Sequence, residues 1–531
     1  MSTTRRQFLE RVGGTAGAGM VYQSMAALGL LPVPVKAAPF QLSSGRRQPD
    51  PNAALDVIVL GGGLAGLTVA YELGKLGYRA TVLEARGRPG GRCFTVRRGS
   101  TSEETDSTQT AAFADGLYFN AGPMRIPHHH EATLHYCREL AVPIEVFVDD
   151  NDSAYVYQTK SATLAGTRVR SREVRADMSG YTSELLAKAI SRQALNAPLT
   201  VGDREALIDY LRFAGGLDAQ NTYKGSSRRG YDPPPGAYDQ AGKMTSPVPL
   251  HDLLGSKAAI YLQTEYLHQP AMFQVVGGTD RLALALASKI EPQIVYNAVV
   301  SGIQQEGDTV SVLYADGEGT GKKLTASYVV CTLPLPIVAA LAEADLAPHV
   351  KAAVAAVPYA NTGKIGLQFG RRFWEEDDGI FGGVSRTDQE IAQIVYPSTG
   401  FLGQKGILTG YYNTLTRATA MGARTPAARE RAALEQGALI HPQYKEAFES
   451  SFSVAWHKVP FSRGGWAQWT PEVRKSAYAA LVKPDRRVYF AGDHLSYLSG
   501  WMAGAFESAQ QTATAIHARA ATTSTTASVG R

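Results

Sequence analysis

The chain alternates short, largely apolar runs with longer segments in which apolar residues recur every three or four positions. The runs at 56–60, 80–83, 328–332 and 487–490 predict buried strands, because a strand covered on both faces lacks polar alternation. The first run leads directly into a helical pattern over 67–76. This succession of strands and helices predicts an α/β fold.

The middle of the chain has a different pattern. From Glu131 to about Ala214 helical periodicity dominates, so we expect a helical insertion there. A stretch rich in Ser, Thr and Glu at 99–110 predicts a surface loop, and a polar, proline-bearing connector follows the insertion at 224–242. The Ala/Thr/Ser tail after Ala518 is expected to be disordered.

Glycines are concentrated where the first strand meets its helix, in the run Gly61-Gly62-Gly63-Leu64-Ala65-Gly66. Gly61 permits a tight turn, Gly63 lets the backbone approach a pyrophosphate, and Gly66 allows close helix packing. Glu84 ends the second strand, where a carboxylate binds ribose hydroxyls in such units. The sequence therefore predicts an adenine-dinucleotide site.

Length and composition narrow the class of protein. With 531 residues, of which 44% are hydrophobic, the chain can build two or three domains. A net charge of +5 without a dense Lys/Arg stripe argues against a nucleic-acid partner. Cys93, Cys137 and Cys331 are widely spaced, which predicts buried free thiols. The adjacent residues His128–His130 point in different directions on a helix, so we predict no metal site.

The N-terminus has the features of an export signal. Residues 4–9, Thr-Arg-Arg-Gln-Phe-Leu, form a twin-arginine signature, and a weakly apolar region over 12–35 ends near a small-residue cleavage pattern at Ala37. Pro32 and Pro34 interrupt the apolar region, which disfavours a stable membrane anchor. We therefore expect a periplasmic or secreted protein.

Two further motifs surround the glycine run. Arg86 and Gly90-Gly91-Arg92 extend it in the way that flavoprotein amine oxidases do, and the strand at 487–490 delivers Gly492 and Asp493 to its carboxyl end. The chain thus resembles the flavin amine oxidase family, and the resemblance implies FAD. The family usually has Glu where Asp493 stands. Members with covalent flavin carry a Cys in the last motif, whereas 499–501 reads Ser-Gly-Trp, so noncovalent FAD is implied.

The resemblance implies a set of cofactor-binding residues at the family's motif positions. Val299, in a strand predicted over 295–300, would face the adenine. The full set is Gly61, Gly63, Leu64, Ala65, Gly66, Glu84, Ala85, Arg86, Gly91, Arg92, Gly122, Pro123, Met124, Arg125, Val299, Trp466, Gly492, Asp493, Gly500, Trp501 and Met502.

The resemblance also implies domains that interleave along the chain, with a Rossmann-like FAD-binding domain, a substrate domain built on a mixed sheet, and a helical insertion. After the signal peptide predicted at 1–37, they are an FAD-binding domain at 53–100, 273–350 and 455–518, a substrate-binding domain at 101–130 and 351–454, and a helical domain at 131–272.

Residues 122–127, Gly-Pro-Met-Arg-Ile-Pro, match L-amino acid oxidases more closely than monoamine or polyamine oxidases. Arg125 is the discriminating residue, since a guanidinium binds a carboxylate bidentately and an amine substrate without a carboxylate does not need it. The structural alternative is an arginine paired with a protein carboxylate.

Three further site residues are implied by local resemblance. Lys364 matches the lysine that holds a water at flavin N5, and Trp501 would form a wall beside the substrate. Tyr411 matches the tyrosine that shares the substrate carboxylate with the arginine, although Tyr412 could be the inward residue instead.

The expected activity is that of an FAD-dependent L-amino acid oxidase. A hydride passes from Cα to flavin N5, and the products are a 2-oxo acid, ammonia and hydrogen peroxide, with oxygen as the second substrate. An amino-acid 2-monooxygenase and a monoamine or polyamine oxidase of the same family are the alternatives, and a homodimer is left open.

Overall fold

The computed structural model describes Phe40 and residues 56–529, except 161–163, 193, 195–198 and 263–264. The predicted signal peptide at 1–37 lies outside the described residues. From Asp56 onward the described residues lie in a single compact unit. None of its described helices is both long and apolar enough to span a bilayer.

A five-stranded parallel sheet takes its strands from the predicted apolar runs. In spatial order the strands are β20 (Val488–Phe490), β13 (Tyr328–Cys331), β1 (Val57–Leu60), β2 (Ala80–Leu83) and β9 (Ile294–Val295). All four residues of β1 are fully buried, because strands flank it on both sides and helices cover it. Segments far apart in sequence therefore meet in one sheet.

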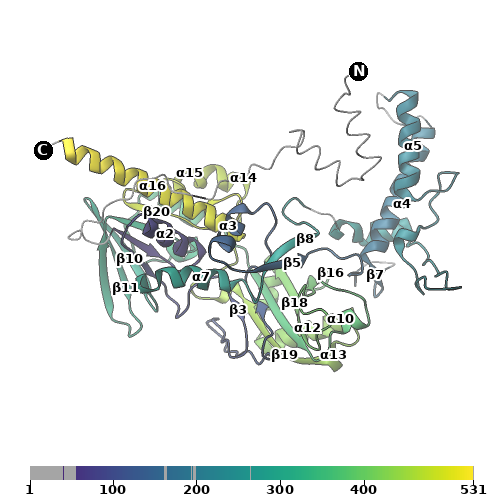
Figure 1. Cartoon of the computed structure of the whole chain (residues 1–531), viewed down its shortest axis with the longest axis horizontal. Coiled ribbons are helices and arrows are strands. Elements are labelled where there is room, and N and C mark those ends of the chain that lie inside the picture. The colour runs from purple at the N-terminus through teal and green to yellow at the C-terminus, as the bar shows by residue number, and fades with distance from the viewer. Residues whose placement is uncertain are drawn as a thin grey trace, which may run out of the picture. The chain divides into compact units, whose positions relative to one another are not determined.

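Helices pack against this sheet. The helix after the glycine run, α2 (Leu64–Lys75), contacts α16 (Met502–Val529) and α7 (Asp280–Ile290), and α16 lies alongside α2 in Figure 1. The tail after Ala518, expected to be disordered, continues α16 instead, which is consistent with the high helix propensity of alanine.

A second sheet has four strands, all from residues 299–344. Its order is β12 (Gly321–Ala326), β11 (Thr309–Ala315), β10 (Val299–Glu306) and β14 (Glu343–Ala344). The strand predicted over 295–300 is therefore wrong as one element, because a turn at Asn297 with φ 55° separates β9 from β10.

A seven-stranded mixed sheet forms the other large layer. Its order is β19 (Phe448–Ala455), β15 (Thr362–Phe369), β18 (Gly406–Thr414), β17 (Gln393–Val395), β16 (Val384–Thr387), β6 (Tyr155–Tyr157) and β7 (Arg168–Arg170). One face buries a large aromatic core that includes Trp374 and Tyr396. The segment predicted as a helical insertion thus also supplies strands to this sheet, and these were missed because each is only three residues long.

The remainder of that segment is mostly helical. Helices α4 and α5 pack against each other, and Thr200 caps α5 through a hydrogen bond from the Asp203 amide at 3.1 Å. The elements are α3 (Glu131–Glu139), β5 (Ile144–Val148), α4 (Ser171–Ser191), α5 (Val201–Gly215), α6 (Leu250–Ser256) and β8 (Ala271–Val275), with β5 and β8 paired antiparallel.

The remaining strands and α-helices complete the fold. They are β3 (Thr95–Val96), β4 (Phe119–Asn120), α8 (Leu335–Val338), α9 (Pro348–Ala356), α10 (Phe373–Glu376), α11 (Leu415–Gly422), α12 (Pro426–Ala438), α13 (Tyr444–Ala447), α14 (Pro471–Val473) and α15 (Ala479–Leu481).

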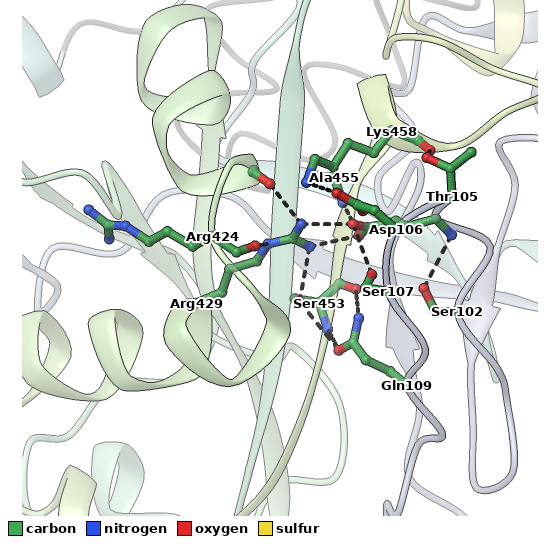
Figure 2. A network of polar contacts seen from close by, with 12 residues as sticks. Ser102, Thr105, Asp106, Ser107, Gln109, Arg424, Arg429, Ser453, Ala455 and Lys458 are labelled. Carbon is green, nitrogen blue, oxygen red and sulfur yellow. Dashed lines mark hydrogen bonds and ion pairs between the residues drawn. The ribbon is translucent and has the colours of Figure 1, made fainter.

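The polar stretch at 99–110 is not simply a surface loop. Glu104 is buried and accepts two hydrogen bonds of 2.7 Å from Arg429, which is fully buried in α12. The Ala455 amide donates to the same carboxylate at 2.8 Å, and Figure 2 shows Arg429 also facing Ser453 in β19. The loop is therefore fixed to α12 and β19 by an internal ion pair.

Candidate active site

One cavity of about 460 Å³ joins the carboxyl ends of the parallel strands to the seven-stranded sheet. Of the predicted cofactor residues, every one except Gly66 lines it. They are Gly61, Gly63, Leu64, Ala65, Glu84, Ala85, Arg86, Gly91, Arg92, Gly122, Pro123, Met124, Arg125, Val299, Trp466, Gly492, Asp493, Gly500, Trp501 and Met502.

The glycine turn has the geometry of a phosphate site. Gly61 adopts φ 99°, and a Cβ on Gly66 would lie 2.0 Å from the Gly61 carbonyl, so Gly66 permits helix packing and does not line the cavity. A Cβ on Gly63 would meet nothing within 4 Å. Gly63 also begins α2 without a side-chain cap, and the first turn of α2 contains no acidic residue. The free amides at this helix end therefore suit the pyrophosphate of a dinucleotide.

Glu84 is held at the next position that a dinucleotide needs. Its buried carboxylate accepts hydrogen bonds from the amides of Gly62 at 2.7 Å and Arg86 at 2.9 Å. Because backbone amides fix both carboxylate oxygens, the side chain is oriented toward the cavity, where ribose hydroxyls can donate to it. The residues present therefore fit FAD.

Arg86 lines the cavity, but its guanidinium forms hydrogen bonds with other residues of the protein. It donates to Glu103 at 2.7 Å and to Ser462 at 2.9 Å. These bonds connect the loop after β2 with the loops at 99–110 and 459–466, and thereby hold the wall of the cavity in place.

An ion pair closes the opposite end of the dinucleotide region. Arg92 binds Asp493, and Asp493 accepts a hydrogen bond of 2.9 Å from the Gly500 amide at the start of α16. Burial alone would raise the pKa of Asp493, but Arg92 and the neighbouring polar groups lower it below its usual value. The aspartate therefore remains charged and fixes the position of the α16 N-terminus.

Lys364 projects from β15 into the cavity and is only 4% exposed. Its ammonium donates to the carbonyls of Gly122 at 2.5 Å and Asn120 at 3.4 Å, and lies 4.6 Å from the ring centre of Tyr412. Burial, with a smaller contribution from Arg125, lowers the pKa of Lys364 well below its ordinary value. The cavity thus contains a basic nitrogen that loses its proton easily.

The prediction for Tyr411 is wrong. Tyr411 is 1% exposed and packs in the aromatic core on the far face of the sheet, opposite Ile365. Tyr412 pairs with Lys364 across the strands and lines the cavity. Successive residues of a strand face opposite sides, so the alternative inward tyrosine is the correct one.

Arg125 reaches the cavity, but it is already paired. Its guanidinium binds Asp149, whose other oxygen lies 3.2 Å from Nδ1 of His268. Burial alone would raise the pKa of Asp149, whereas Arg125 and His268 lower it below its usual value. The alternative raised for Arg125, a protein carboxylate as its partner, is therefore found in the structure, although Arg125 also lines the cavity.

Trp501 forms an aromatic wall of the cavity. Its ring meets His130 edge to face at 4.9 Å and His268 at 5.6 Å between centres. His130 is buried, and burial lowers its pKa to about 4, so it packs as a neutral ring. Within the described parts of the chain, no group of histidines, cysteines or carboxylates is arranged to hold a metal ion.

Several residues in or beside the cavity could not be identified from the sequence. Asp149 and His268 lie in the segment where the resemblance is weakest, so no motif identified them. Cys93 lines the cavity next to Arg92. Its position directly after the motif Gly90-Gly91-Arg92 is the signal by which the sequence could have placed it in the site. All three cysteines are free and buried, as predicted.

Comparison with known proteins places this geometry in a family. A family described as flavin containing amine oxidoreductase matches residues 64–517. The putative L-amino-acid oxidase YobN of Bacillus subtilis (strain 168) is 28% identical over 467 residues, covering 85% of this chain and 92% of the relative. The L-amino-acid oxidase BjussuLAAO-I of Bothrops jararacussu is 28% identical over 470 residues, covering 85% and 88%.

Solved structures share the fold. Cyclohexylamine oxidase from Brevibacterium oxydans IH-35A matches with a TM-score of 0.59 at 17% identity, covering 87% of this chain and 99% of that one. A putrescine oxidase variant matches with a TM-score of 0.59 at 18% identity, covering 88% and 99%. Because the family match spans most of the chain and its dinucleotide motifs line one cavity, the protein belongs to the flavin-containing amine oxidoreductases.

Proposed function

We propose that the chain is an FAD-dependent L-amino acid oxidase. The observation that carries this proposal is the meeting of Arg125, Lys364, Tyr412 and Trp501 in the same cavity as the dinucleotide elements. The names of the relatives, which are L-amino-acid oxidases, support it.

The side chains divide the work of binding between them. Arg125 and Tyr412 offer donors to the substrate carboxylate, and Trp501 restricts the amino acid from the side. Lys364, with its lowered pKa, exchanges a proton readily with a water or with the substrate amine. FAD, when bound, would supply the redox chemistry, as the acceptor of the hydride from Cα and the donor of two electrons to oxygen.

The overall reaction balances without another cofactor. An L-amino acid, oxygen and water give a 2-oxo acid, ammonia and hydrogen peroxide, because the imino acid formed by oxidation is hydrolysed. Anaerobic mixing of the purified protein with each common L-amino acid tests the proposal. Bleaching of the flavin absorbance by at least one of them, with a 2-oxo acid as product, is expected, and no bleaching by any of them would refute it.

A carboxylate-free amine is the second candidate substrate. The pairing of Arg125 with Asp149 favours it, because the arginine already has a protein carboxylate as its counter-ion. Monoamines and polyamines belong in the same anaerobic screen, and faster bleaching by them would assign an amine oxidase. In a separate aerobic reaction, where oxygen can be incorporated, an amide and carbon dioxide in place of the 2-oxo acid would assign an amino-acid 2-monooxygenase.

The flavin is expected to be noncovalent. Cys93 is the cavity's thiol, and burial raises its pKa to about 12, so it stays protonated and unreactive at neutral pH. Acid precipitation of the yellow protein should leave all the flavin in the supernatant. A coloured protein pellet after washing would contradict this prediction.

Lys364→Met is expected to stabilise the protein by on the order of 1–4 kcal/mol near pH 7, because it removes a buried ionisable amine that has no carboxylate partner. Oxygen consumption should fall in the same variant, because the proposed proton exchange at Lys364 is lost. The folded-state pKa of Lys364 lies below its unfolded value, so wild-type stability rises with pH up to about 10.5. The stability gap should therefore narrow as pH rises toward about 10.5. Urea unfolding at several pH values measures it, and a constant gap would show that Lys364 does not titrate as described.

We also propose export by the twin-arginine route, on the basis of residues 4–37, which lie outside the described residues. An exported protein whose N-terminal sequence begins near Ala38 would support it, whereas a cytoplasmic protein that retains Met1 would not.

A further inference from the structure

A second, much smaller cavity of about 20 Å³ adjoins the main one, and His268 lines both. Asp149 and Arg386 line the smaller cavity. Asp149 also binds Arg125, which lines the larger cavity. These charged side chains therefore connect the two cavities.

Arg386 reaches this place because of strand alternation in β16. Val384 packs against Met124 and Tyr412, on the face of the sheet that borders the main cavity. Ser385 points to the opposite face, where it bonds within the aromatic core. Arg386, two residues after Val384, projects from the same face as Val384.

The three charges act on one another. Burial lowers the pKa of Arg386, the charge of Asp149 raises it, and the charge of Arg125 lowers it again. Two arginines and one aspartate leave an excess of one positive charge. Beside them, Arg175 binds both Asp150 and Asp152. Asp150 lines the smaller cavity and offsets the charge of Arg175, whereas the side chain of Asp152 is 64% exposed, so solvent screens its charge.

We propose that Arg386 determines specificity by giving the Arg125–Asp149 pair one excess positive charge, which makes this end of the cavity bind ligands that carry a single carboxylate. The proposal rests on the proposed function, since the carboxylate is taken to be that of the substrate.

Because Asp149 already compensates the charge of Arg125, a substrate carboxylate needs a further positive charge nearby, and Arg386 supplies it. Without Arg386 the pair of Arg125 and Asp149 would be neutral, and a second carboxylate would meet as much repulsion from Asp149 as attraction from Arg125. With Arg386 present, a bound carboxylate neutralises the cluster, so desolvation of the ligand is compensated.

The test is a charge-swap series read by calorimetric titration with benzoate, a carboxylate without an amine. FAD-containing protein is used for all variants, at one pH and one ionic strength. Arg386→Gln should weaken benzoate binding roughly tenfold, and Asp149→Asn should tighten it roughly tenfold. The double variant, which again carries one excess positive charge, should bind benzoate with about wild-type affinity.

Two controls separate charge from structure. Arg371→Gln removes an exposed arginine outside both cavities and should leave benzoate affinity unchanged. Benzamide, which has the shape of benzoate without its charge, should bind all variants alike. Arg386→Lys keeps the positive charge and should retain wild-type affinity for benzoate. If Arg386→Gln does not fold, the benzoate affinities of Arg386→Lys and Asp149→Asn test the proposal in its place.

Unchanged benzoate affinity in Arg386→Gln, or weaker binding in Asp149→Asn, would overturn the proposal. Failure of the proposed function looks different, because it appears as absence of flavin bleaching with every L-amino acid while benzoate affinity still follows the charge of the cluster.

Discussion

Replacing Arg125 by alanine is expected to raise the KM for L-amino acids by about 30-fold or more. Truncating one partner of a desolvated charge contact costs about 2–5 kcal/mol, and each 1.4 kcal/mol is a tenfold change in affinity. The value of kcat should change much less, because Arg125 contacts the carboxylate and not the bond that breaks. Oxygen consumption over a range of substrate concentrations measures both constants.

The variant also removes the partner of Asp149, so its control is the double variant Arg125→Ala, Asp149→Ala. If the rise in KM comes from weaker substrate binding, the double variant shows the same rise in KM, while its folding stability recovers. Flavin content checks that the cavity is intact. An unaltered KM in Arg125→Ala would remove this residue from the substrate site and leave the amine as the better candidate substrate.

Arg429→Met is expected to lower the free energy of unfolding by about 3–5 kcal/mol, since it leaves the Glu104 carboxylate buried without its cation. The lost partner is bidentate and fully buried, so solvent does not compensate. Chemical denaturation followed by tryptophan fluorescence gives the difference, together with the temperature at which flavin is released.

Arg371→Met is the matched control, because Arg371 binds Glu376 and Asp377 on the surface. Exposed ion pairs contribute about 0–1 kcal/mol, so this variant should stay close to wild type. Glu104→Gln combined with Arg429→Met removes both charges and should recover part of the stability. Equal stability of wild type and Arg429→Met would show that the buried pair contributes no net stability.

The cofactor half of the site was predictable because its chemistry is local in sequence. The strand predicted at Ala80–Leu83 has these bounds in the structure, and Gly61, Gly63, Glu84 and Asp493 all line the cavity. Each of these residues acts through backbone geometry or through a fixed offset from a strand end. Such features are visible in a single stretch of chain.

The substrate half was less predictable, because its contacts depend on pairing between distant segments. The choice between Tyr411 and Tyr412 depends on the register of β18 with β15, and alternation alone leaves both faces open. Glu104 and Arg429 are 325 positions apart, so a polar stretch that predicts exposure is buried by a partner that no local pattern reveals. Asp149 could not be identified from the sequence for the same reason, since its partner His268 is 119 positions away.

The five-stranded sheet has a consequence for the order in which the protein can mature. Its central strands come from residues near 57 and 330, but its edge strand β20 ends at Phe490, and Asp493 just beyond it fixes both Arg92 and the start of α16. A nascent chain still lacking this last segment has the phosphate turn but no enclosed place for the cofactor. Cofactor loading must therefore wait until synthesis is almost finished, and a route that carries folded proteins would be the only one compatible with export of a loaded enzyme.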